Sequence, residues 1–214
     1  MRKIESDTCE NIPRDAVVTA IDYADGQHFA LHRHDRGQFA YAACGVITVY
    51  TDQGNWVVPP QRAIWVPAGV PHEMSMNGPV TMLNTYIRGP VCARLGLPAQ
   101  CQVFGISPLL HPLLIQATDI PALYDETRRE GLLMNLLLHE IAEMPPLSLN
   151  APLPGEPRLA RACRTLLEQP SLDIGIDDMA RQVGMSRRTF TRLSRQQTGL
   201  RFVEWRQPAC LLAA

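Results

Sequence analysis

Two histidines lie two residues apart in the segment LHRHDRGQ, at His32 and His34, and Gln38 follows four residues after the second. Residues two apart in a strand point to the same face, so the two imidazoles would lie beside each other. Imidazole nitrogens are common ligands of transition metals. The segment therefore fits a metalloenzyme, a sensor of a metal or small ligand, or a barrel that merely carries polar side chains.

A second group of candidate residues lies in the segment 172–206, LDIGIDDMARQVGMSRRTFTRLSRQQTGLRFVEWR. Two aspartates suit the start of a first helix, Gly184 suits the turn that follows it, and Ser186 can cap a second helix. On that second helix Phe190 and Leu193 would face inward. Its outer face would carry Arg187, Arg188, Thr191, Arg192 and Arg195. This order predicts a helix-turn-helix, whose second helix enters a DNA major groove; the alternative is a structural helix pair with a solvated basic face.

Length and composition limit the remaining possibilities. The chain has 214 residues, enough for one large domain or two small ones, and its net charge is −1. Residues 158–206 nevertheless hold ten arginines against five acidic residues, which is a weak sign of nucleic-acid binding. The polar N-terminus and the six cysteines without CxxC spacing predict a cytoplasmic protein with reduced thiols. No segment is long and apolar enough to predict a membrane span.

The hydrophobic pattern divides the chain into four predicted parts. Short runs rich in Val, Ile, Tyr and Trp alternate with turn signals over residues 15–88, which predicts an all-β domain. Beyond Pro90 the apolar residues recur at helical intervals. A proline-rich stretch then predicts a semi-extended linker before a last helical region. The predicted boundaries are 1–90 for the β-domain, 91–144 for a helical hairpin, 145–157 for the linker and 158–214 for the α module.

The histidines belong to a pattern that resembles the two motifs of the cupin family. The pattern reads Gly26-x5-His32-x-His34-x3-Gln38-x6-Gly45, followed by Pro67-x-Gly69-x2-His72. The resemblance implies a double-sheet β-barrel whose mouth brings together His32, His34, Gln38 and His72. Gln38 stands where the family has a carboxylate, so Zn²⁺, Ni²⁺ or Cu²⁺ suits these ligands better than Fe²⁺ or Mn²⁺. A metal-free pocket for a small molecule and purely structural histidines are the alternatives.

The basic module resembles the first helix-turn-helix of AraC-family transcription regulators. The matching phrases are DMARQVGMSRRTFTRLSRQQ and TGLRFVEWR. The resemblance implies base contacts from Arg188, Thr191 and Arg192. It implies phosphate contacts from Arg187, Arg195 and the helix start at Ser186.

The same resemblance implies a homodimer. It places the dimer contact on an apolar stripe of the helical hairpin, made of Leu133, Leu136, Leu137 and Ile141. A stripe that packs only on its own barrel is the alternative.

Three features depart from the AraC pattern. A second helix-turn-helix is absent from this sequence, Pro208 falls inside the helix that would lead to it, and Ser194 replaces a buried phenylalanine. These departures predict a truncated regulator whose DNA binding is impaired.

The predicted fold is therefore α+β, with a cupin-like barrel, a helical hairpin and an all-α helix-turn-helix module. The predicted function is transcription regulation, in which the barrel senses a small molecule or a metal and the module binds double-stranded promoter DNA. No enzymatic activity is expected. One alternative is a cupin metalloenzyme of the dioxygenase or isomerase type, which leaves the basic module without a role. The other is a dimerising regulator fragment that no longer binds DNA specifically.

Overall fold

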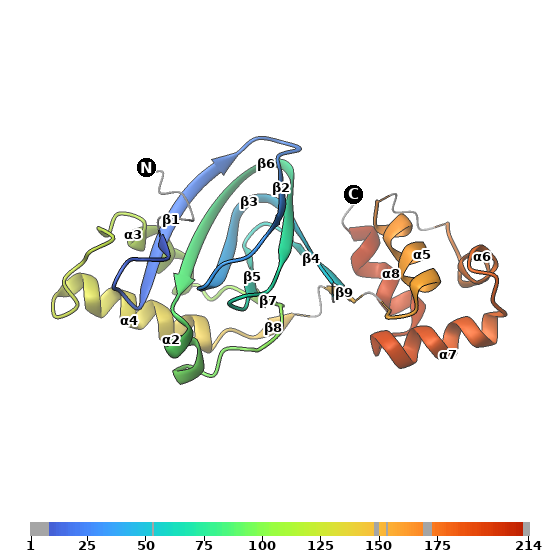
Figure 1. The fold of residues 1–214 in the computed structure, drawn as a ribbon. Helices are drawn as coiled ribbons and strands as arrows, with labels where there is room; N and C mark the ends of the chain where they lie inside the picture. The colour runs from blue at the N-terminus through green and yellow to red at the C-terminus, as the bar shows by residue number, and fades with distance from the viewer. Residues whose placement is uncertain (1–8, 53, 148–149, 153, 169–172, 212–214) are drawn as a thin grey trace. The chain divides into compact units, whose positions relative to one another are not determined.

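The computed structural model describes residues 9–52, 54–147, 150–152, 154–168 and 173–211. Helices and antiparallel strands are combined in two compact units (Figure 1). Residues 1–49 and 58–148 form the first unit, and residues 50–57 and 149–214 form the second. The prediction of helices together with an antiparallel sheet is confirmed. Among the described residues, no helix combines the length and the apolar character needed to cross a bilayer.

The first unit is built on an antiparallel sheet. Its strands are β1 (Ala16–Tyr23), β2 (His28–His32), β3 (Gly37–Thr51), β5 (Arg62–Val66), β6 (His72–Ile87), β7 (Gln102–Gly105) and β8 (Pro146–Leu147). They join in the order β1-β6-β3-β5-β7-β8, and β2 also pairs with β6. The sheet thus brings together strands that are far apart in the sequence.

The 16-residue strand β6 organises this sheet. Its first part pairs with β2, where His32 lies opposite His72. Its last part pairs with β1, from Tyr23 opposite Val80 to Ala16 opposite Ile87. A single long strand therefore aligns both β1 and β2, and it also pairs with β3.

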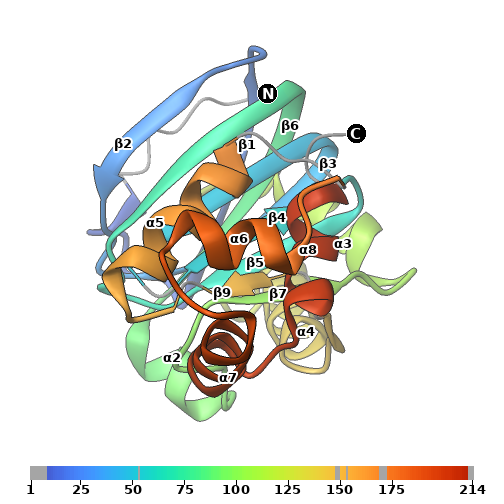
Figure 2. The ribbon, with the colours of Figure 1, turned by 90° about the vertical axis from the view of Figure 1, so that its right-hand side faces the viewer.

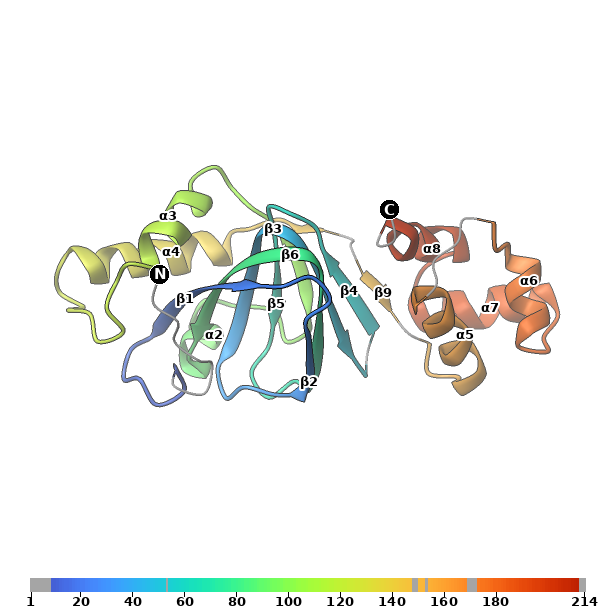
Figure 3. The same cartoon turned by 90° about the horizontal axis from the view of Figure 1, so that it is seen from above.

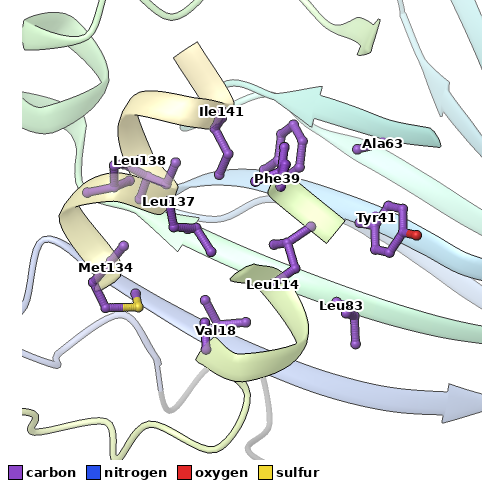
Figure 4. Packing of buried hydrophobic residues seen from close by; sticks show 14 of the residues in the cluster. Val18, Phe39, Tyr41, Ala63, Leu83, Leu114, Met134, Leu137, Leu138 and Ile141 are labelled. Atoms are coloured by element: carbon purple, nitrogen blue, oxygen red, sulfur yellow. The ribbon is translucent and has the colours of Figure 1, made fainter. Parts of the chain in front are cut away.

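Helices cover one face of the sheet. They are α2 (Gly89–Arg94), α3 (Leu110–Ala117) and α4 (Arg129–Ala142). Figure 3 shows α3 and α4 lying next to each other beside the strands, and Figure 4 shows their apolar side chains meeting Val18, Phe39 and Leu83. Alternation along β1 and β6 turns every second residue toward this core and leaves the others on the opposite face.

The predicted dimer stripe on α4 divides between this core and the surface. Leu137 is 0% exposed and Ile141 is 1% exposed, and Leu133 packs partly buried against the same core. Leu136 remains 45% exposed. Leu137 and Ile141 therefore pack on their own sheet, which is the alternative reading of the stripe, and they are not available to a second copy.

The segments 91–144 and 145–157 also contain strands, which the hydrophobic pattern did not predict. β7 pairs with β5, with Val103 opposite Ile64, and both residues are buried. β8 pairs with β7 at the edge of the sheet, where Pro146 lies opposite Phe104. A proline is tolerated at a sheet edge because its missing N–H is not needed there. Strands of four and two residues are too short to give a recognisable alternation.

The second unit contains a helical cluster and a short strand pair. Its elements are β4 (Gly54–Val58), β9 (Asn150–Pro152), α5 (Pro157–Glu168), α6 (Ile176–Gln182), α7 (Arg187–Thr198) and α8 (Phe202–Leu211). β4 pairs with β9. The helical core centres on Phe190, Phe202 and Trp205, and the rings of the first two meet edge to face at 5.6 Å. Pro208 lies within α8, so the helix does not end at this proline.

Candidate functional site

Three histidines meet at one end of the sheet. His32 ends β2, His72 begins β6, and His34 follows β2 in a loop. The ring centroids of His32 and His72 lie 4.3 Å apart, and the ring of His34 is 4.9 Å from the first and 5.4 Å from the second. One ligand atom from each imidazole lies within 4.8 Å of the others. The pairing of β2 with β6 thus brings the three residues into a cluster that could hold a metal ion.

Backbone carbonyls fix the orientation of two of these rings. The Nδ1 of His32 donates to the carbonyl of Ala30 at 2.8 Å, and the Nδ1 of His72 donates to the carbonyl of Val70 at 2.9 Å. A carbonyl can only accept, so in the neutral ring the proton lies on Nδ1 and the lone pair lies on Nε2. The Nε2 of His72 is buried and has no hydrogen-bond partner among the described residues. These features match an imidazole that is prepared to bind a metal.

Burial also keeps His72 neutral. Loss of solvent lowers the pKa of this imidazole to about 4, with the neighbouring His32 and His34 acting in the same direction. The hydrogen bond to Val70 opposes the shift without cancelling it. The ring is therefore uncharged at neutral pH, which is the form that binds metal.

Gln38 belongs to a buried polar group that the sequence did not reveal. Its Nε2 donates to Oδ1 of Asn84 at 2.9 Å, and Thr19 lies opposite Asn84 in the pairing of β1 with β6. The Oε1 of Gln38, the Nδ2 of Asn84 and the Oγ1 of Thr19 are buried without a partner among the described residues. Alternation along β6 places His72 and Asn84 on the same face of the sheet. This face therefore offers unsatisfied donors and acceptors in addition to the imidazoles.

The basic face of the second unit lies on α7, which follows α6 after a short turn. α6 is followed by Gly184 at a φ of +66°, and α7 begins after Ser186, whose Oγ accepts from the N–H of Thr189 at 3.2 Å. Phe190 is fully buried. Figure 2 looks nearly along α7 and shows α6 above it, running across the line of view. The predicted inner and outer faces of α7 are the observed ones.

The outer face of α7 is exposed and almost uniformly basic. It is an open surface of this one helix, formed by Arg187, Arg188, Thr191, Arg192, Arg195 and Gln196. Arg187 pairs with Asp177 at 3.1 Å, and Arg192 contacts Oε1 of Gln196 at 3.4 Å. On the inner side, Ser194 is 5% exposed, at the buried position expected for it. α7 thus presents cations from a rigid, capped helix.

Comparison with known proteins bears on both units. Residues 16–141 match the family model described as the AraC-like ligand binding domain. The HTH-type transcriptional regulator NimR of Escherichia coli (strain K12) is 29% identical over 187 residues, which cover 86% of this chain and 66% of that protein. The chain thus spans just under two-thirds of the length of this relative. The predicted truncation stays a prediction.

Two solved structures are also similar. Apo ToxT K231A from Vibrio cholerae strain SCE256 has a TM-score of 0.47 at 7% identity, covering 92% of this chain and 80% of its own. A cupin superfamily protein from Desulfitobacterium hafniense DCB-2 has a TM-score of 0.33 at 18% identity, covering 35% of this chain and 68% of its own.

The contact between Gln38 and Asn84 predicts a measurable energetic coupling. Gln38→Ala and Asn84→Ala should each lower the free energy of unfolding by about 1–3 kcal/mol, because each leaves a buried polar group unpaired. The loss of unfolding free energy in the double variant should be smaller than the sum of the two single losses by at least about 0.5 kcal/mol. Urea denaturation of the four proteins measures this, and strictly additive losses would show that the two amides do not interact.

Proposed function

The chain belongs to the family of the AraC-like ligand binding domain, and on this premise we propose that it is an AraC-type transcription regulator. In this proposal the first unit binds the effector and the second unit binds promoter DNA. The observation that carries the proposal is the capped helix α7, with four arginines on one exposed face. A metalloenzyme of the same sheet would leave this basic face without a use.

The chemistry of α7 suits a DNA major groove. Arg188 and Arg192 can each donate two hydrogen bonds to guanine, and the methyl group of Thr191 can contact thymine. Arg187 and Arg195 are assigned to phosphates, together with the helix start at Ser186. Ser186 caps that helix start, and N–H groups at a helix N-terminus favour anions. This division of roles follows the AraC resemblance, residue by residue.

We expect such binding to be weak and nearly indifferent to sequence, because one recognition helix reads only a few base pairs. Arg187→Ala and Arg195→Ala, the two arginines assigned to phosphates, should each weaken binding to random and promoter duplexes alike, and each should lower the salt slope by about 1. Arg181→Ala is the matched control, since Arg181 is exposed on α6 and paired with Asp178. Competition gel-shift at about 0.15 M salt measures this. A promoter preference of about a hundredfold or more would contradict it.

The three-histidine cluster is proposed to hold Zn²⁺, Ni²⁺ or Cu²⁺ as part of the effector site. Three neutral imidazoles suit these ions, and the buried, unpartnered Nε2 of His72 supports the fit. Gln38 is the proposed fourth ligand, because its amide N–H is held by Asn84 and its Oε1 is left for another partner. When bound, the metal would supply positive charge to the effector site.

Metal analysis tests this assignment. After dialysis against Zn²⁺, the wild-type protein should retain close to one equivalent, and His72→Ala should retain almost none. His139→Ala is the control, because His139 is an exposed histidine on α4. Gln38→Ala should bind more weakly than wild type. Equal retention by the wild type and by His72→Ala would refute the site.

The chain is also proposed to form a homodimer through the exposed surface of α4. Leu132 is 67% exposed and Leu136 is 45% exposed, one helical turn apart. Sedimentation velocity should show a wild-type dimer, and Leu136→Asp should be a folded monomer. Leu137→Ala should instead lower the free energy of unfolding by about 2–5 kcal/mol, because it opens a cavity in the core. A monomeric wild-type protein, or a Leu136→Asp variant that remains dimeric, would exclude this interface.

A further inference from the structure

A carboxylate from the N-terminal segment lies beside the three-histidine cluster. The Oε1 of Glu10 is 3.9 Å from the Nδ1 of His34 and accepts from the N–H of Asp35 at 3.0 Å. His34 is 6% exposed, and the side chain of Glu10 is 30% exposed. The carboxylate is therefore held by the backbone of the residue that follows His34, on the Nδ1 side of the ring.

Buried contacts on both sides of Glu10 fix the segment that carries it. Cys9 is fully buried and packs with Val17 and Tyr86. The guanidinium of Arg36, which is 4% exposed, donates to the carbonyls of Glu10 at 3.4 Å and Arg14 at 3.0 Å, and also to that of Ile12. Several hydrogen bonds to one buried cation hold this segment in a single position over the sheet.

Glu10 lies on the side of the His34 ring where backbone carbonyls bond to the other two rings. His32 and His72 each place Nδ1 against an acceptor and keep the Nε2 lone pair for another partner. At His34 a carboxylate lies on the Nδ1 side, at a distance that is electrostatic contact rather than a hydrogen bond. A shift of roughly 1 Å would bring it to hydrogen-bond length. Acceptors of this kind set the tautomer of a metal-binding imidazole and strengthen the ligand.

We propose that Glu10 is a positioning residue of the three-histidine site: it orients His34 for metal binding and supplies the negative charge that Gln38 lacks. This inference rests on the proposed metal binding. Glu10 belongs to the segment 9–14, so the affinity for metal should depend on whether that segment is docked on the sheet. The coupling is reciprocal: bound metal should stabilise the docked segment by the same free energy by which docking strengthens metal binding.

The test compares Glu10→Gln with the wild type in Zn²⁺ titrations against a competing chelator. The amide keeps the side chain's size and an oxygen for the N–H of Asp35, but removes the charge. We expect the Zn²⁺ affinity to fall about 10–100-fold. Glu10→Asp, which keeps the charge on a shorter side chain, should recover part of the loss. Glu73→Gln is the matched control, because Glu73 lies 3.5 Å from the exposed His28, and its affinity should equal that of the wild type.

A second measurement, the alkylation of Cys9, reports whether the segment 9–14 is docked. Burial raises the pKa of the Cys9 thiol to about 11, so its alkylation should depend on release of the segment. Zn²⁺ should slow the alkylation of Cys9, followed by peptide mapping, in the wild type and in Glu73→Gln. It should have little effect in Glu10→Gln or in His72→Ala.

The possible outcomes separate the two proposals. A wild-type protein that binds no Zn²⁺ overturns both the metal site and the role of Glu10. A wild-type protein that binds Zn²⁺ beside a Glu10→Gln variant of equal affinity overturns the role of Glu10 alone. A Glu10→Asp variant as weak as Glu10→Gln would also count against it, because charge would then not be the property that matters.

Discussion

The dual pairing of β6 is the constraint on which the first unit depends. Because its first residues pair with β2, His72 lies opposite His32, and because its last residues pair with β1, Asn84 lies opposite Thr19. A slip of one residue in either ladder would turn every side chain of the slipped strand to the other face. It would expose the apolar residues that meet α3 and α4 and scatter the imidazoles. The apolar core and the histidine cluster are thus two consequences of one register.

The second unit depends on local backbone chemistry instead. Gly184 adopts the left-handed conformation that ends α6, and Ser186 caps α7 three residues before its hydrogen-bond partner, Thr189. Because α7 begins at that point, its helical repeat of about 3.6 residues places Phe190 in the core and the arginines on the exposed face. Short-range sequence signals could therefore indicate the glycine turn and the serine cap, whereas the helix-turn-helix module and its DNA binding are proposals.

Part of the site could be predicted from the sequence. Spacing along one strand placed His32 and His34 side by side, and the resemblance to the cupin motifs added His72; the structure brings these three imidazoles together. Contacts between distant residues could not be read in the same way. Nothing near Gln38 indicates Asn84, 46 residues away, and nothing in the spacing of the histidines points to a glutamate on the N-terminal segment. The apolar stripe of α4 could be recognised in the sequence. Its periodicity does not reveal whether the stripe packs against the chain's own sheet or against a second copy of the chain.

X-ray absorption spectroscopy of the Zn²⁺-loaded protein tests the central claim most directly. The claim is that the sheet register and the acceptors at Nδ1 prepare His32, His34 and His72 to bind one metal together. The account predicts an outer-shell signal from three imidazoles and only nitrogen or oxygen in the first shell, at about 2.0–2.2 Å. A sulfur shell near 2.3 Å, or the signal of a single imidazole, would contradict it.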